Sequence, residues 1–172
     1  LQTSGHQFQS KTDTEVVLHA FIEWGADCLN QLNGMFAFAI WDKAHRELFL
    51  ARDRYGIKPI YYIFTDGLFI FSSEQKAIIT HPDVRRIIDL DALIEYFTFQ
   101  NIFTNRTFLK DIKLFPAGHY AYLPFGSSYN DLRPVQYWDF DFQNPVNPLS
   151  EQEYVEELDR LFRQAVNRRN HK

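Results

Sequence analysis

With 172 residues, 45% of them hydrophobic and 17% aromatic, the sequence is long enough for about one domain with a substantial core. Its formal net charge of −4 provides no positive field for phosphate groups, so we expect neither nucleic acid nor a membrane as a partner. The single cysteine, with no signal-type leader and no apolar run of membrane-spanning length, predicts a cytoplasmic protein.

The first predicted element is a helix that begins at a capping box formed by Thr12 and Glu15. In this motif the hydroxyl and the carboxylate both bind backbone N–H groups at the start of the helix. Apolar residues then recur at helical spacing, and Gly25 supplies the expected end. The predicted inner face consists of Val16, Val17, Ala20, Phe21 and Trp24. A second, short helix is expected in residues 26–32.

After the Asn33–Gly34 turn the apolar pattern changes to the period of strands. Residues 35–41 are apolar on both faces, which predicts a strand that is buried on both sides. Three more strands are predicted at 47–53, 59–65 and 68–73, the last two joined by a tight Asp66–Gly67 turn. Four short antiparallel strands in succession indicate a meander.

Two helices are predicted next, one at 73–80 capped by Ser73 and one at 89–99. We expect both to cover one face of the sheet. The inner side of the second helix is predicted to contain Leu90, Leu93, Ile94 and Phe97. A strand at 112–123 with a bend at Pro116–Gly118, and a last strand at 135–142, complete the predicted sheet.

Residues 141–150 contain two prolines and two asparagines without helical periodicity, which is typical of an interdomain linker. We therefore place a domain boundary near residue 145. Ser150 and Glu153 form a second capping box before another predicted helix. Its apolar stripe comprises Tyr154, Leu158, Leu161, Phe162, Ala165 and Val166.

Residues that could perform chemistry are few. The six histidines show no ligand-type spacing to one another or to Cys28, so no metal site is predicted. Cys28 has no basic neighbour to lower its pKa, which favours a buried structural role over a nucleophilic one. The charged cluster Arg52–Arg54 is expected to fix the turn around Gly56. Asp13 is either an acidic first-turn residue or a ligand for a cationic group.

Several blocks, in order, carry a family resemblance: GHQFQSKTDTEVVLHAFIEWG, RDRYGIKPIYY, FSSEQKAI, LFPAGHY and YWDF. Together they resemble the class II glutamine amidotransferase domain of glutamine-hydrolysing asparagine synthetases. The resemblance implies an α+β fold over residues 1–145, an N-terminal-nucleophile (Ntn) hydrolase-type four-layer sandwich of antiparallel sheets between helices, truncated at its N-terminus. Residues 146–172 would be a linker and the first helix of the ATP-binding synthetase domain.

The resemblance also implies an activity for the full-length protein. Such enzymes hydrolyse glutamine and use the ammonia for amidation of aspartate, with ATP and Mg²⁺ in the synthetase domain. The family's N-terminal cysteine and its S-G-G-x-D-S loop for ATP do not occur in this sequence. We therefore expect no catalytic residue, metal or cofactor in this fragment, which should be inactive alone and of low stability because one sheet edge lacks its partner strands.

Two residues occupy positions that the family uses. Asp13, within the pattern S-x-[ST]-D-[TC]-E, matches the aspartate that holds the α-amino group of glutamine. Met35 resembles a residue that lines the ammonia passage, whereas a core methionine is the alternative interpretation. Two alternative functions stay open from the sequence. The chain could be a noncatalytic interaction module that uses the last helix, or an amidotransferase with a different amine acceptor. Whether the protein forms a homodimer is also open.

Overall fold

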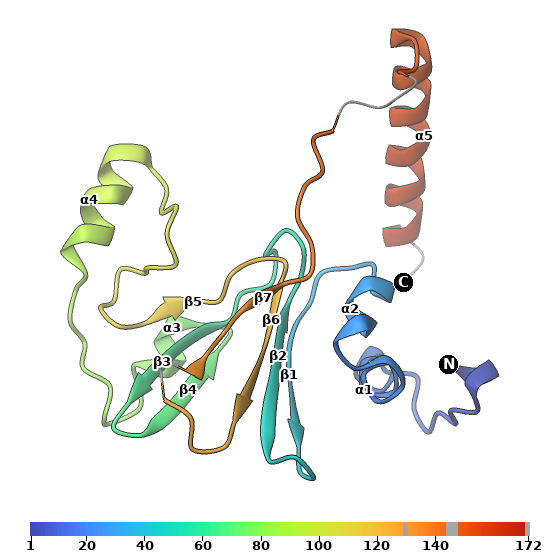
Figure 1. Cartoon of the computed structure of the whole chain (residues 1–172). Coiled ribbons are helices and arrows are strands. Elements are labelled where there is room, and N and C mark those ends of the chain that lie inside the picture. Colours follow the sequence, from blue (N-terminus) through green and yellow to red (C-terminus); the bar gives the residue numbers. More distant parts are fainter. Residues whose placement is uncertain (129–130, 144–147, 171–172) are drawn as a thin grey trace. The chain divides into compact units, whose positions relative to one another are not determined.

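The structure is a computed structural model that describes residues 1–128, 131–143 and 148–170. The chain divides into two compact units, Leu1–Asp139 and Phe140–Lys172, and each is described by itself (Figure 1). The boundary predicted near residue 145 lies outside the described residues.

The first unit begins with helical elements. They are η1 (Gln2–Ser4), α1 (Asp13–Trp24), η2 (Gly25–Asp27) and α2 (Cys28–Gln31). The predicted start and end of α1 are confirmed, because the Thr12 side chain accepts the N–H of Glu15 and Gly25 ends the helix with φ 56°. The predicted inner face is only partly correct. Ala20 is buried, but Val16 and Trp24 are 41% and 39% exposed.

In the described residues, seven strands form two antiparallel sheets. They are β1 (Ala37–Asp42), β2 (Glu47–Arg52), β3 (Tyr61–Thr65), β4 (Leu68–Ser72), β5 (Lys113–Leu114), β6 (His119–Pro124) and β7 (Val135–Gln136). One sheet has the order β1-β2-β6-β7 and the other has the order β4-β3-β5. The predicted combination of antiparallel sheets with helices is therefore confirmed at the level of fold class.

The predicted four-stranded meander is wrong, because the two hairpins belong to different sheets. The β1–β2 hairpin pairs through β2 with β6, and the β3–β4 hairpin pairs through β3 with β5. Residues 53–60 carry the chain from one sheet to the other. Within the second hairpin the predicted turn is confirmed, since Asp66 and Gly67 have φ values of 46° and 77°.

The strand predicted to be buried on both faces is instead an edge strand. It begins at Ala37, two residues later than predicted, and β2 is its neighbour in the described part of the sheet. Phe38 and Ile40 pack toward α1 and α2, whereas Ala39 is exposed and Trp41 is 45% exposed. One face is therefore covered, and the alternation along the strand leaves much of the other open.

The short helix α3 (Gln75–Ile78) packs on the three-stranded sheet, as predicted, through the fully buried Ile78. Its predicted cap is wrong. Glu74 occupies the N-cap position, and the N–H of Glu74 donates to the hydroxyl of Ser72 rather than to that of Ser73.

The helix α4 (Leu90–Phe99) begins after Asp89, whose carboxylate accepts the N–H of Ala92. Its predicted inner side is largely wrong, since Leu90, Ile94 and Phe97 are 69%, 65% and 78% exposed. Ala92 is the buried residue of this helix, and Figure 1 shows α4 apart from both sheets. The expectation that α4 covers a sheet face is therefore wrong.

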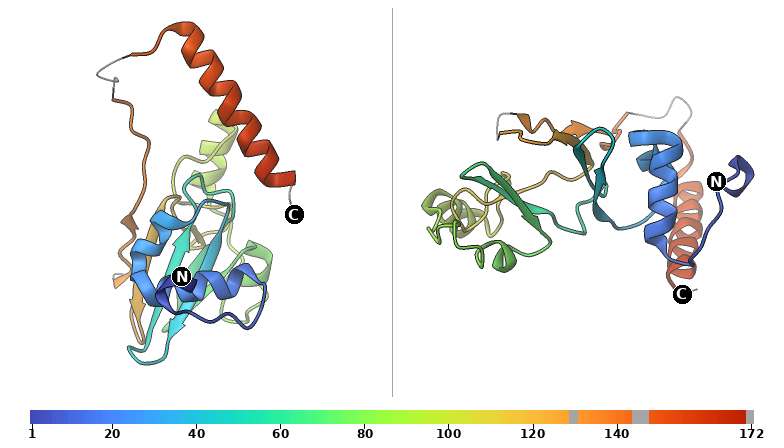
Figure 2. Two further views of the ribbon diagram at one scale, coloured as in Figure 1. Left: turned by 90° about the vertical axis from the view of Figure 1, so that its right-hand side faces the viewer. Right: turned by 90° about the horizontal axis from the view of Figure 1, so that it is seen from below.

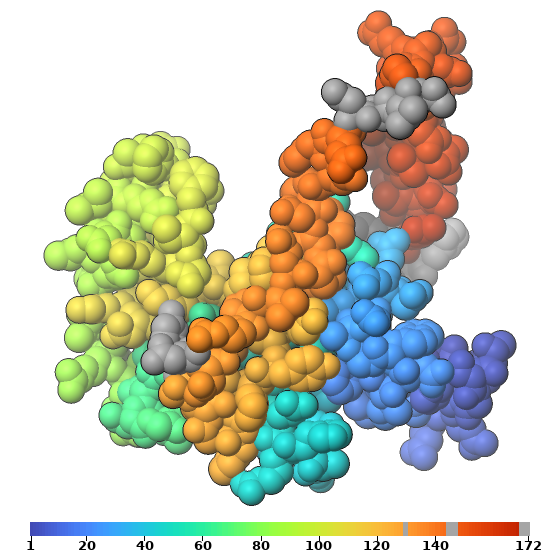
Figure 3. All heavy atoms as spheres, viewed as in Figure 1, coloured from blue at the N-terminus to red at the C-terminus, as the bar shows by residue number. Residues whose placement is uncertain are grey.

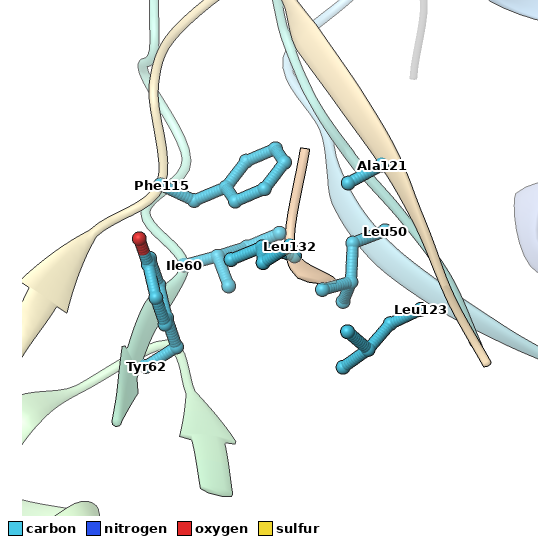
Figure 4. Close-up of a cluster of buried hydrophobic side chains, with 7 residues drawn as sticks. All are labelled: Leu50, Ile60, Tyr62, Phe115, Ala121, Leu123 and Leu132. Atoms are coloured by element: carbon cyan, nitrogen blue, oxygen red, sulfur yellow. The ribbon is translucent and has the colours of Figure 1, made fainter. Parts of the chain in front are cut away.

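Beyond α4, the predicted bend at Pro116–Gly118 is confirmed and separates β5 from β6. The last predicted strand is shorter than expected and is limited to β7. The core between the two sheets is shown in Figure 4, and consists of Leu50, Ile60, Tyr62, Phe115, Ala121, Leu123 and Leu132.

In the second unit the described regular element is the helix α5 (Glu151–Asn170). Its predicted capping box is confirmed. The Glu153 carboxylate accepts the N–H and hydroxyl of Ser150, and the Ser150 hydroxyl accepts the N–H of Glu153 at 3.3 Å. Leu158 and Phe162 of the predicted apolar stripe are 69% and 67% exposed.

Candidate functional site

Asp13 is the first residue of α1, and its carboxylate is exposed. Its Oδ1 atom accepts the N–H of Thr14 at 2.9 Å. The carboxylate thus sits at the positive end of the helix dipole, where negative charge is favoured. An exposed anion held in this way can also accept hydrogen bonds from an ammonium group.

The residue that fixes the backbone before Asp13 is Glu15. Its carboxylate accepts the N–H of Gln9 at 2.7 Å, the N–H of Ser10 at 2.6 Å and the Ser10 hydroxyl at 2.5 Å. The N–H of Thr12 instead donates to the Ser10 hydroxyl. The predicted reciprocal capping box is therefore only half correct, because Glu15 turns toward the segment preceding the helix rather than toward the cap residue.

A surface depression of about 570 Å³ borders this segment. Its lining includes Ser10, Lys11 and Val16, which flank Asp13 in the sequence. Phe8 supplies an apolar wall, and Lys11 supplies a positive charge. The depression therefore combines polar and apolar surface and is lined by residues close in sequence to Asp13, although Asp13 itself is not among its lining residues.

The second predicted site residue, Met35, lies in the connection between α2 and β1 and is 45% exposed. Asp13 and Met35 thus belong to different elements, one at the start of α1 and one just before β1. The alternative of a methionine enclosed in the core does not fit this exposure.

A buried polar junction connects the two sheets at the end of β2. The carboxylate of Asp53, which is 1% exposed, accepts the N–H groups of Tyr55, Ile57 and Lys58 at 3.2, 2.9 and 2.9 Å. The predicted role of the charged cluster in fixing the turn around Gly56 is confirmed. The sequence did not reveal that a single carboxylate binds three backbone donors.

Arg52 binds backbone carbonyl groups at the same junction, whereas Asp53 binds backbone N–H groups. Its guanidinium donates to the carbonyl oxygens of Lys58, Gly56 and Phe115, and burial lowers its pKa. Because Phe115 follows β5 and Gly56 follows β2, these hydrogen bonds link the two sheets. We interpret the junction as structural, since both charged groups are occupied by backbone partners.

The comparisons with known proteins decide the family. Residues 1–138 match the family of the glutamine amidotransferase domain. The chain belongs to this family. Two relatives are the glutamine-hydrolysing asparagine synthetase 3 of Bacillus subtilis (strain 168), 40% identical over 169 residues, and the putative asparagine synthetase 2 of Methanocaldococcus jannaschii, 33% identical over 160 residues. A third is amidase chyE of Penicillium rubens, 30% identical over 170 residues.

These alignments include 98%, 92% and 95% of this chain, respectively. They include only 26%, 30% and 24% of the three relatives. The chain therefore spans less than a third of the length of these curated relatives. The similarity extends past residue 138 into the second unit, so it is not confined to the matched amidotransferase domain.

Within residues 1–128, 131–143 and 148–170 there is no group of three or more His, Cys, Asp or Glu side chains that could hold a metal ion. The sequence also does not contain the S-G-G-x-D-S loop with which the family binds ATP. In the same described ranges, no helix has both the length and the apolar character to cross a membrane.

Cys28 of the amidotransferase domain is fully buried on α2, which confirms its predicted burial. Burial, together with the nearby Asp27 carboxylate, raises the pKa of its thiol to about 11. We expect iodoacetamide at pH 8 to alkylate native Cys28 at least about 100-fold more slowly than an ordinary thiol, because so little thiolate forms. Mass spectrometry would follow the reaction, and rapid labelling without urea would contradict this expectation.

The hydrogen bonds of Glu15 predict that the stability of the folded protein depends on pH in the acidic range. Hydrogen bonds from Gln9 and Ser10 lower the pKa of Glu15 from 4.5 to about 2 in the folded protein. A carboxyl group whose pKa is lower in the folded than in the unfolded state stabilises the fold. This contribution is complete at a pH above the unfolded-state pKa and is lost as the pH falls through the folded-state pKa. We expect the difference in urea midpoint between wild type and Glu15→Gln to shrink between pH 4.5 and 2. A difference independent of pH over this range would contradict the assignment.

Proposed function

We propose that the first unit is part of the glutamine-handling domain of an asparagine synthetase. In that protein, ammonia released from glutamine would be used for the ATP-dependent amidation of aspartate. The observation that carries the proposal is the similarity to asparagine synthetases over 169 residues, which continues beyond the amidotransferase domain. The 40% identity to this relative also exceeds the 30% identity to amidase chyE over a similar length of the chain.

The proposal includes the four-layer, N-terminal-nucleophile arrangement. It is supported by three apolar clusters that lie between successive layers. Cys28 and Phe49 belong to the cluster between the first helices and the four-stranded sheet, and Leu50 and Phe115 to the one between the sheets. Ile78 belongs to the cluster between α3 and the three-stranded sheet. In the described part of the sheet β1 pairs on one side with β2, and we propose that a further strand of the domain pairs on its other side.

Within this domain we assign Asp13 to the α-amino group of glutamine. Its exposed carboxylate at the start of α1 is free to approach a ligand, and the bound Ser10 and Gln9 keep the preceding backbone in place. A carboxylate that binds an ammonium group forms a charge-assisted hydrogen bond. The depression beside Lys11 offers space next to this position.

The assignment is tested by titrating the ¹⁵N-labelled chain with L-glutamine and with an analogue that lacks the α-amino group. We expect Asp13→Asn to weaken glutamine binding about tenfold or more, and to leave binding of the analogue unchanged. An equal effect on both ligands would show that Asp13 does not bind the amino group. No response of the Thr14 amide to glutamine at any concentration would exclude a glutamine site at this helix start.

We propose Met35 as a wall of the ammonia path, which its exposed position next to β1 permits.

For the chain alone we propose that glutamine is not hydrolysed, because the single cysteine of the sequence is buried and has a raised pKa. Incubation with glutamine should yield no glutamate above a protein-free control. Glutamate formed by the purified chain, and lost in Cys28→Ala, would overturn this.

A second candidate function is an amidotransferase with a different amine acceptor. The similarity to amidase chyE, at 30% identity over 170 residues, favours keeping this alternative. The two are distinguished by supplying the full-length protein with glutamine, ATP, Mg²⁺ and either aspartate or other carboxylic acids. Asparagine as the main product supports the first candidate, and amidation of another acid supports the second.

A further inference from the structure

Two histidines connect the N-terminal segment, residues 1–10, to α1. The Nδ1 atoms of His6 and His19 are 2.9 Å apart, within hydrogen-bonding distance. His6 Nε2 also lies 2.9 Å from a carboxylate oxygen of Glu23, and His19 Nε2 lies 3.7 Å from a carboxylate oxygen of Glu15. The segment lies at the surface beside α1 (Figures 2 and 3). Four ionisable side chains thus form a continuous chain between two parts of the molecule.

These four side chains are partly shielded from water. The side chains of His6, Glu15 and His19 are 14%, 17% and 22% exposed, and that of Glu23 is 34% exposed. The ring of Phe8 packs edge-on against His19, with ring centroids 4.9 Å apart. Hydrogen bonds and charges in such surroundings interact more strongly than on an open surface.

The contact between the two rings restricts the number of protons that they can hold. A hydrogen bond between two imidazole nitrogens needs one N–H donor and one bare acceptor. If His6 donates from Nε2 to Glu23, its Nδ1 accepts from the Nδ1–H of His19. One added proton can then enter at His19 Nε2, where it faces the Glu15 carboxylate. A second added proton must enter at His6 Nδ1 and places two donors against each other.

The charged groups that face the two rings come from α1. Helix α1 contributes the carboxylates of Glu15 and Glu23, and His6 is the only titratable side chain of the N-terminal segment. The second proton retains both carboxylate contacts but removes the bond between the rings. Two cationic rings with centroids 4.8 Å apart also repel each other.

We propose that the His6–His19 pair is a proton-dependent latch. It holds the N-terminal segment on α1 while the pair carries at most one added proton, and it loosens the segment when the second proton binds. Glu15 extends the latch, because the same carboxylate that faces His19 binds the backbone N–H groups of Gln9 and Ser10.

The test combines two NMR measurements on the full chain between pH 8 and 5. Imidazole ¹⁵N shifts count the protons on each ring, and amide hydrogen exchange reports protection of Gln9 and Ser10, corrected for the intrinsic effect of pH. We expect protection of these amides to fall about five- to tenfold as the second proton binds, which corresponds to the loss of one hydrogen bond. Amides of β2, such as that of Leu50, should not change over the same range.

Variants make the test specific. In His6→Gln, which retains a neutral polar side chain, protection of Ser10 should no longer respond to this change of pH. His45→Gln, which alters a histidine paired with Asp42 in another turn, should leave the response intact. If His6→Gln unfolds the chain, His19→Gln serves in its place. Unchanged protection of Gln9 and Ser10 when both rings are cationic, or a response retained without His6, would overturn the latch.

Discussion

Replacing Asp53 by Ala should lower the free energy of unfolding by about 3–5 kcal/mol. The carboxylate of Asp53 is buried and accepts three backbone N–H groups within the segment that joins the two sheets. Without it, these donors lose their acceptor in a place with little access to water. The Arg52 guanidinium next to it would also lose a neighbouring negative charge.

Asp53→Asn separates the charge from the hydrogen bonds. Its amide oxygen can accept two N–H groups as Oδ1 does, but its NH₂ group would face the N–H of Lys58. We therefore expect this variant to be destabilised as well, although less than Asp53→Ala. Asp27→Asn is the matched control, because Asp27 is exposed and makes no side-chain cap bond to α2.

Urea unfolding followed by circular dichroism measures these differences. Asp27→Asn should stay within about 0.5 kcal/mol of the wild type. If Asp53→Ala is destabilised no more than Asp27→Asn, the buried junction does not hold the sheets as described.

Gly118→Ala should be the second strongly destabilised variant, by about 2–4 kcal/mol. Gly118 has φ 65°, and a Cβ atom added there would lie 2.7 Å from the carbonyl oxygen of Trp138. The backbone of Gly118 also makes two hydrogen bonds. Its N–H donates to the backbone carbonyl oxygen of Asp53, and its own carbonyl oxygen accepts the N–H of Tyr137. The strand β6 therefore has little freedom to shift away from a new methyl group.

The matched control for this substitution is Gly126→Ala. Gly126 also has a positive φ, 83°, but a Cβ atom there would meet no other atom within 4 Å. It should therefore show only the backbone cost of about 1–2 kcal/mol. Thermal unfolding of both variants separates the two effects, and equal losses would rule out the close approach of Trp138 as a cause.

Local signals in the sequence predicted local structure well. Thr12, Gly25 and the Asp66–Gly67 turn each act on a few neighbouring backbone groups, so their residue types were sufficient to place helix ends and a hairpin. The assignment of strands to sheets was predicted wrongly, because the sequence analysis placed both hairpins in one meander. Periodicity shows which side chains share a face, but it contains no information on which strand is the neighbour.

The exposed stripe on α4 shows a second limit. Helical spacing correctly indicates that Leu90, Ile94 and Phe97 share a face, but it cannot show whether anything in the described part of the chain packs on that face. Asp13 came to attention through a family motif, and the helix dipole alone would not have assigned it a ligand. The contact between His6 and His19 was not foreseen, because thirteen residues separate them and only the return of the segment onto α1 brings them together.

The division of the strands between two sheets also affects how the chain folds. Both hairpins, β1–β2 and β3–β4, join strands that are close in sequence, so they can form within microseconds once their turns are in place. The strands β5 and β6, by contrast, must return from far along the chain to pair with β3 and β2. Closing these long loops costs entropy before any contact repays it, which should make the arrival of residues 113–124 the slow step of folding.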